Sequence, residues 1–262
     1  MASSPESRFT FGSDPSPEIS AYLRQKQMRP AFRHTEVWGE EHAYAFTVAK
    51  AVQADVLTAI HDSLQTAIDK GVPYEAWARN LKPELKRLGW WGDAVEMADP
   101  ATGEVKPREL GTPRRLRTIY SANLRSARAA GQWERGQRTK AVLPFYLYQL
   151  GPSERHRPEH IGKEGVVRPV DDPLWATWFP PNGWGCKCWL RQITKAEAER
   201  RGVTPAFDVP TTTFSRTRDD GSTERVTVPV GIDPGWASNP GLNRASTLMT
   251  NMTMKLRRLR GK

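Results

Sequence analysis

Apolar residues recur at helical spacing through the first third of the chain. Between residues 40 and 67 they repeat every three or four positions, which predicts an amphipathic helix. Residues 73–88 carry a second apolar stripe, which predicts a helix interrupted at Pro83. A shorter helix is expected to open at Pro17 and to end near Pro30. Together these elements predict a helical region over residues 18–92.

The strongest helical pattern covers residues 112–140. Thr112 suits the N-cap, and Pro113 suits the first helical position, where an amide proton is not needed. An apolar stripe runs from Leu116 to Ala127, with basic residues distributed around it. We therefore expect a long basic helix, preceded by a loop over residues 93–111.

Beyond residue 140 the pattern changes to short strands. Residues 144–150 and 189–193 predict strands, residues 166–167 predict a shorter one, and residues 211–230 predict a hairpin. Thr194 followed by Glu197 is a capping-box pattern that predicts a short helix. The predicted fold class is α+β, in which the helical region precedes a compact mixed domain, residues 112–241, with a small antiparallel sheet. Residues 1–17 are rich in serine and proline and predict a disordered arm, and residues 242–262 predict a basic tail.

Charge adds a functional expectation to this fold. The 262 residues include 39 Lys and Arg against 29 Asp and Glu, a net charge of +10. Such an excess favours nucleic acid or an acidic protein face as partner, although a solvated basic surface is the simpler alternative. No run of about 18 apolar residues occurs, so no transmembrane helix and no membrane partner are expected. The candidate contact residues are Arg114, Arg115, Arg125, Arg128, Arg257, Arg258 and Arg260.

One stretch, residues 171–188, concentrates constrained and aromatic residues and contains both cysteines of the chain. Pro180 and Pro181 exclude a helix and hold the chain extended. Asn182-Gly183 predicts a turn, because both residues tolerate positive φ. Large apolar side chains at Trp184 and Trp189 flank the cysteines and are expected to bury them. We therefore interpret this stretch as a packed structural element rather than a linker.

The two cysteines suggest metal chemistry. Cys186 and Cys188, with His160 or His156, offer the mixed sulfur and nitrogen ligands that zinc accepts, with water or a carboxylate as the fourth ligand. A disulfide between cysteines one residue apart would be strained, and reduced thiols suit synthesis in a cytoplasm. Packed thiols without metal remain the alternative.

Evidence for catalysis is weaker. Neither a glycine-rich phosphate loop, nor a Gly-x-Ser-x-Gly elbow, nor the paired patterns of zinc deaminases occur in the sequence. The alternative hypothesis is that the protein is a metal-dependent nuclease or other hydrolase acting on nucleic acid. Its active site would be centred on His156, His160, Cys186 and Cys188. Glu159 and Asp171 or Asp172 could add carboxylates to it. The leading hypothesis is that the protein is not an enzyme.

Several blocks between residues 117 and 193 carry a family resemblance. They are Arg117–Leu124 with Ala129–Trp133, the strand Pro144–Tyr148, Arg157–His160, Asp172–Trp175, and Phe179–Cys188. In order and spacing they resemble the minor head protein family of tailed double-stranded DNA phages, typified by the F protein of phage Mu and gene product 7 of phage SPP1. The structural signature within these blocks comprises Asp172, Pro173, Trp175, Pro180, Pro181, Asn182, Gly183 and Trp184.

The resemblance implies a structural role in phage head morphogenesis. It implies a minor capsid protein at the portal vertex or head interior of the virion, made in the cytoplasm of the bacterial host. Its implied partners are the portal protein and the major capsid or scaffold proteins, with packaged double-stranded DNA as a further contact. The family histidine and cysteines correspond to His160, Cys186 and Cys188, which the resemblance implies as a local zinc site or a tightly packed cluster.

Overall fold

The computed structural model of this protein describes residues 17–92, 94–100, 102–218, 220–245 and 249. The expected arm before residue 17 and most of the expected basic tail, with Arg257, Arg258 and Arg260, lie outside the described residues. No helix among the described residues has both the length and the apolar character needed to cross a membrane.

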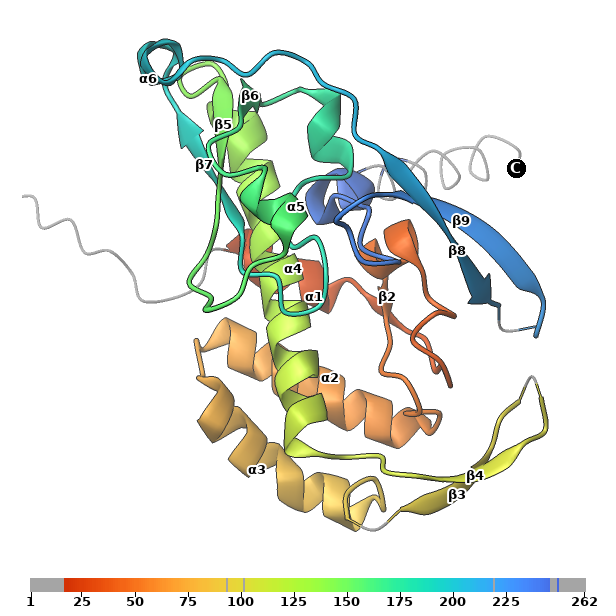
Figure 1. Ribbon diagram of the computed structural model, residues 1–262. Helices are drawn as coiled ribbons and strands as arrows, with labels where there is room; N and C mark the ends of the chain where they lie inside the picture. Colours follow the sequence, from red (N-terminus) through yellow and green to blue (C-terminus); the bar gives the residue numbers. More distant parts are fainter. Residues whose placement is uncertain (1–16, 93, 101, 219, 246–248, 250–262) are drawn as a thin grey trace, which may run out of the picture.

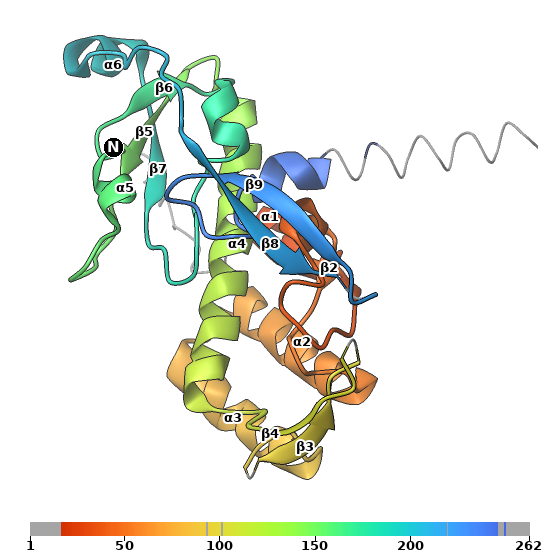
Figure 2. The ribbon, with the colours of Figure 1, turned by 45° about the vertical axis from the view of Figure 1, so that its right-hand side comes forward.

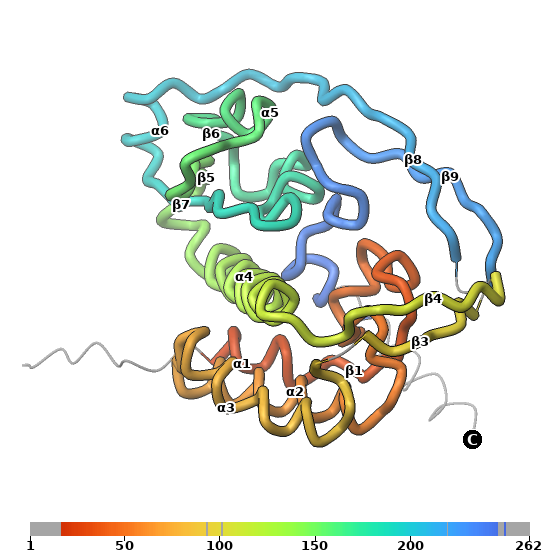
Figure 3. Tube along the Cα trace, turned by 60° about the horizontal axis from the view of Figure 1, so that its bottom comes forward, coloured from red at the N-terminus to blue at the C-terminus, as the bar shows by residue number. Residues whose placement is uncertain are grey.

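Helix α4, Pro113–Thr139, runs through the middle of the molecule (Figure 1). Its 27 residues make it the longest element of the described chain. As predicted, Thr112 caps the helix, because its side chain accepts a hydrogen bond of 3.2 Å from the Arg115 amide, and Pro113 occupies the first position. Helices lie on one side of α4 and a small sheet on the other, as the view along the helix shows (Figure 3).

The helical side contains α1 (Pro17–Arg24), α2 (Ala54–Asp69) and α3 (Tyr74–Arg87). Pro83 does not interrupt α3, because it lies on the exposed face, where water can solvate the carbonyl that loses its partner. The core between these helices and α4 is built from fully buried aliphatic and aromatic side chains. Its central members are Leu23, Val56, Leu57, Ile60, Leu64, Leu85, Leu116 and Ala130.

The helix predicted to begin near residue 40 begins only at Ala54, so that boundary was wrong. Residues 39–43 form a short 3-10 helix, η1 (Gly39–Ala43), and β2 (Ala45–Phe46) follows it. Strand β2 pairs in parallel with β1 (Gln27–Met28). Ala45 and Phe46 are both buried although they are neighbours in sequence, which reflects this packing rather than one stripe of a helix.

Strand β5 (Phe145–Gln149) is the centre of a three-stranded antiparallel sheet. It pairs with β6 (Val167–Pro169) on one edge and with β7 (Trp189–Ile193) on the other. Three short helices lie in or next to this part of the chain: α5 (Pro158–Ile161), η2 (Pro173–Ala176) and α6 (Lys195–Arg201). The predicted α+β class with a small antiparallel sheet is thus confirmed. The aromatic core beside the sheet contains Trp133, Tyr146, Tyr148, Trp175, Trp178 and Phe179.

Two hairpins extend from this body (Figure 2). The first joins β3 (Val95–Ala98) to β4 (Val105–Arg108) within the region predicted as a loop. The second joins β8 (Thr211–Thr217) to β9 (Thr223–Pro229), where a hairpin was predicted. After β9 the chain returns to the body, and a final helical stretch occupies residues 240–245.

Close packing of α4 against the sheet gives a first prediction. A methyl group at Gly136 would overlap the Tyr146 hydroxyl and lie 2.9 Å from the ring carbon that bears it. Gly136→Ala should therefore lower the free energy of unfolding by about 1–3 kcal/mol, as overpacking does. In an open helix the same change raises stability by about 1 kcal/mol. Chemical denaturation monitored by circular dichroism measures the difference.

The matched control is the double variant Gly136→Ala with Tyr146→Phe. Removing the hydroxyl removes the worst overlap, and among the described residues that buried hydroxyl has no hydrogen-bond partner. The double variant should recover most of the lost stability. Equal instability of the single and double variants would contradict the packing of α4 on Tyr146.

Candidate metal centre

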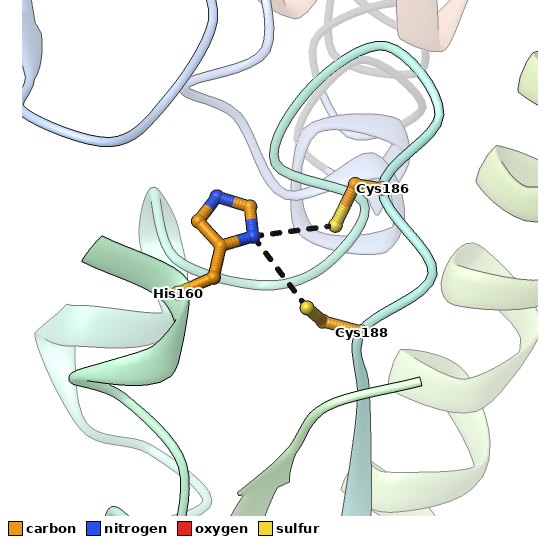
Figure 4. Close-up of side chains that lie close together, drawn as sticks. All are labelled: His160, Cys186 and Cys188. Atoms are coloured by element: carbon orange, nitrogen blue, oxygen red, sulfur yellow. Dashed lines mark hydrogen bonds between the residues drawn. The ribbon is translucent and has the colours of Figure 1, made fainter. Parts of the chain in front are cut away.

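Three side chains from separate elements converge beside the sheet (Figure 4). His160 lies in α5, Cys188 immediately precedes β7, and Cys186 lies two residues before Cys188. The His160 Nδ1 atom is 3.8 Å from the Cys186 sulfur and 3.5 Å from the Cys188 sulfur. His160 and Cys186 are buried, at 2% and 5% exposure, and Cys188 is partly buried. We call these three residues the Cys–His cluster.

A hydrogen bond on the side away from the sulfurs fixes the orientation of the His160 ring. Its Nε2 atom is 2.8 Å from the Gly231 carbonyl oxygen, which can only accept a hydrogen bond. Nε2 therefore donates to this carbonyl, and Nδ1 faces the two sulfurs. A histidine whose other ring nitrogen donates to a backbone carbonyl is the usual arrangement at protein metal sites.

The two thiols influence each other in opposite directions. The Cys186 thiol donates to the Cys188 sulfur, and this contact, with His160 and Tyr148, lowers the pKa of Cys188. The same contact with Cys188, together with burial, raises the pKa of Cys186. A bound metal would displace the remaining proton, because thiolates are the ligands of metals.

The distances of the Cys–His cluster fit a zinc ion. Tetrahedral zinc with ordinary bond lengths places a nitrogen and a sulfur ligand roughly 3.6 Å apart. The two nitrogen–sulfur distances here, 3.5 and 3.8 Å, lie close to that value. All three ligand atoms lie within 4.8 Å of one another. The chain thus supplies three of the four ligands that zinc prefers, of a type suited to zinc rather than to magnesium or calcium.

The loop that carries Cys186 is fixed by buried polar contacts. Asn182 has no exposed surface, and its side-chain amide donates to the Thr177 carbonyl at 3.1 Å. The Asp233 carboxylate accepts the Trp184 amide at 2.7 Å and an Arg157 guanidinium nitrogen at 2.8 Å. No pattern in the sequence predicts the pairing of Asp233 with Arg157 and Trp184, because these residues lie far apart in the chain.

The signature residues of the sequence lie around the same loop. Asp172 caps η2 through the Leu174 amide at 2.9 Å and pairs with Arg168, and Trp175 is fully buried. The peptide bond between Pro180 and Pro181 is cis. The turn falls slightly later than predicted, since the Cys186 amide donates to the Gly183 carbonyl and Gly185, not Gly183, has positive φ.

The tryptophans in and next to this stretch are buried to different degrees. Trp184 and Trp189 remain 45% and 44% exposed, whereas Trp175 and Trp178 are fully buried. The Trp178 ring packs edge-on against His160, with the two ring centroids 5.7 Å apart.

The four candidate arginines within the described residues divide into two pairs. Arg115 donates to the carbonyls of Ala49 and Leu110, and Arg125 donates to the Cys186 carbonyl at 2.8 Å. Both guanidinium groups therefore hold the framework together. Arg114 and Arg128 are exposed on α4.

The residues of the nuclease alternative are brought together only in part, since three of them form the Cys–His cluster and the others lie outside it. The His156 Nε2 atom contacts the Gly151 carbonyl at 2.8 Å and is not a member of the Cys–His cluster. Asp171 pairs with Lys140, and Asp172 is held by Arg168 and the η2 amides. In the part of the chain that the structure describes, the group of His, Cys, Asp or Glu side chains able to hold a metal is the Cys–His cluster.

These features define an α+β protein whose aromatic core is closed by a buried cluster of two cysteines and one histidine. Residues 58–191 match the family model described as "Phage Mu protein F like protein". The chain belongs to this family, which confirms the resemblance seen in the sequence. No solved structure matches it significantly.

Two curated relatives support the family assignment. The chain is 36% identical over 243 residues to the "Putative capsid assembly protein F" of Escherichia phage Mu, an alignment that covers 87% of this chain and 54% of that protein. It is 35% identical over 192 residues to the "Mu-like prophage FluMu F protein" of Haemophilus influenzae, covering 73% of this chain and 42% of the relative. The alignments thus span about half the length of these relatives.

Proposed function

We propose that this protein is a minor capsid protein that acts in head morphogenesis of a tailed double-stranded DNA phage. The observation that carries the proposal is family membership together with the capsid-assembly name of the phage Mu relative. The proposed location is the portal vertex or head interior of the virion.

In this proposal the helical region and the α+β domain, which pack on either side of α4, have different functions. The helical region, residues 18–92, docks on the portal or on major capsid or scaffold proteins. The α+β domain, residues 112–241, provides a rigid body closed by the Cys–His cluster. The continuous burial of α4 against both sides supports this division, because it would transmit docking on one side to the position of the other.

Co-assembly tests the head role. When the chain is produced with its cognate portal, scaffold and major capsid proteins, it should sediment with procapsids. Omission of the portal should remove it from the particles if the portal is the docking partner. Procapsids that form normally and never contain the protein, with no binding to portal, scaffold or capsid protein alone, would contradict the proposal.

We further propose that the Cys–His cluster binds a structural zinc ion. The geometric fit of its nitrogen and sulfur atoms supports this, as does the orientation of His160 by Gly231. Zinc would replace the proton between the two thiols and join α5 to the segment that enters β7. Water would complete the four ligands, since no carboxylate joins the cluster among the described residues.

Elemental analysis of the purified protein tests the zinc proposal. One zinc per chain is expected, and it should be lost in Cys186→Ser and in Cys188→Ser because each removes a thiolate ligand. His156→Ala is the matched control, since this histidine lies in the same segment but outside the cluster. Removal of zinc with a chelator should lower the melting temperature of the wild-type chain. Metal-free protein that takes up no added zinc would leave packed thiols as the explanation.

The proposal also includes contact between α4 and packaged DNA through Arg114 and Arg128. Both side chains are exposed, and the net charge of +10 favours a polyanionic partner. Arg115 and Arg125 are left out of this surface because they bind backbone carbonyls.

Salt-dependent binding to non-specific duplex DNA tests this contact. Replacing both Arg114 and Arg128 with glutamine should reduce the slope of log affinity against log salt by about two, because each phosphate contact contributes about 0.9. Arg87→Gln is the control, since that guanidinium is already paired with Glu84 on α3. An unchanged slope in the double variant, or no binding at low salt, would exclude this DNA surface.

A further inference from the structure

A cavity of about 270 Å³ lies on the side of α4 away from α2 and α3, apart from the Cys–His cluster. Its walls come from α1 and the segment that follows it, from the N-terminal half of α4, from Pro181 and Trp184, and from the chain between residues 234 and 243. The segment after α1 and the chain between residues 234 and 243 lie side by side next to α4 (Figure 2). Four large aromatic side chains are part of the walls: Tyr22, Trp38, Trp184 and Trp236.

The charged groups around this cavity are of one sign. Lys26, Arg114 and Arg115 line it, with the neutral or cationic rings of His34 and His42. Among the described residues that form its walls there is no aspartate or glutamate. A positive, aromatic cavity of this size is complementary to a small anion carried on an apolar body.

Lys26 is the key residue, because it is buried without a counter-charge. Its side chain is 9% exposed, and its ammonium nitrogen lies 4.4 Å from the centre of the Tyr22 ring. No carboxylate or carbonyl accepts a hydrogen bond from this ammonium group in the described chain. Burial of an ammonium group without a counter-charge is unfavourable, so a carboxylate that enters this cavity would meet a cation able to pair with it.

Three arginines of the described chain that point inward have acceptors within it. Arg168 pairs with Asp172, Arg244 pairs with Glu134, and Arg115 binds two carbonyls. Lys26 therefore differs from these arginines because it has no acceptor within the described chain, and not because it is more buried. Burial lowers the pKa of Lys26 to about 7, and burial together with the Lys26 charge lowers the pKa of His42 to about 3. The low value for His42 agrees with its ring lying near the lysine ammonium inside this cavity.

We propose that this cavity binds a carboxylate on an acidic, partly aromatic peptide segment of a partner protein, with Lys26 as its counter-ion. A concave aromatic cavity can accept a single side chain or a chain end. The phosphates of duplex DNA lie on the outside of a wide helix and would not fit into it. Trp184 marks the entrance, since it is 45% exposed and its ring stacks edge-on against Trp236 at 5.0 Å. That the partner is a phage head protein rests on the proposed function, whereas the ligand chemistry does not.

Binding of short peptides to the full chain tests the proposal. The probes are acetyl-Leu-Phe, which ends in a free carboxylate, and acetyl-Phe-Glu-amide, which carries a side-chain carboxylate. Each is compared with its uncharged analogue, acetyl-Leu-Phe-amide or acetyl-Phe-Gln-amide. Binding is followed by NMR of the tryptophan indole protons at pH 6, below the pKa of Lys26. At least one acidic probe should bind about tenfold or more tightly than its neutral analogue, as expected for a charge-assisted hydrogen bond.

Lys26→Met keeps the length of the side chain and removes its charge, so it should abolish this preference for the acidic probe. Lys82→Met is the matched control, because that ammonium lies 5.1 Å from the Trp91 ring outside the cavity. If Lys26→Met does not fold, Trp184→Leu at the exposed entrance should weaken both acidic probes in a folded chain. Equal affinity for acidic and neutral probes overturns the proposal. So does binding of inorganic phosphate alone, or no binding at all.

The outcome is separable from the head-assembly role. Peptide binding that fails while the protein still enters procapsids would remove the cavity proposal and leave the proposed function intact. Peptide binding that succeeds while the chain never joins a procapsid would keep the carboxylate site and remove the phage head partner.

Discussion

The close approach of α4 to both of its neighbouring layers is the constraint on which the rest of the structure depends. Small residues make it possible: Gly131 faces Ile19 of α1, and Gly136 faces the Tyr146 hydroxyl of β5. Ala127 and Ala130 are fully buried on the helical side, and Ala129 and Trp133 belong to the aromatic core on the other. The helix α4 thus contributes side chains to both cores. A larger side chain at either glycine would push α4 away from the layer that packs against it.

The Cys–His cluster closes the second of these cores at the point where three distant segments meet. His160 is held by the Gly231 carbonyl, the loop before Cys186 is held by Asp233, and Arg125 of α4 binds the Cys186 carbonyl. The position of α4 and the geometry of the cluster are coupled through the Arg125 contact.

Local signals in the sequence predicted much of this. The cap at Thr112, the alternation of β5 and the capping box before α6 act over a few residues, so periodicity and residue type reveal them. His160 and the cysteines stood out because the residue types are rare and because the family resemblance joined them. The pairing of Asp233 with the Trp184 amide spans 49 residues and leaves no periodic trace. The wrong predicted start of α2 also results from a contact between separate segments. Parallel pairing with β1 buries Ala45 and Phe46, which the sequence pattern could not reveal.

Net charge predicted the positions of binding residues poorly, and the structure explains why. Positive side chains that look alike in sequence differ in what already neutralises or solvates them. Arg115 and Arg125 bind carbonyls inside the framework, so they are poor candidates for a phosphate surface. Arg128 on α4 is exposed, and water already solvates its charge. Lys26 is 9% exposed and lines a cavity whose described walls carry no carboxylate, and burial lowers its pKa, so a ligand that brings a carboxylate would favour its charged form. The positive charge that most requires a partner is therefore a buried one, which net charge alone cannot locate.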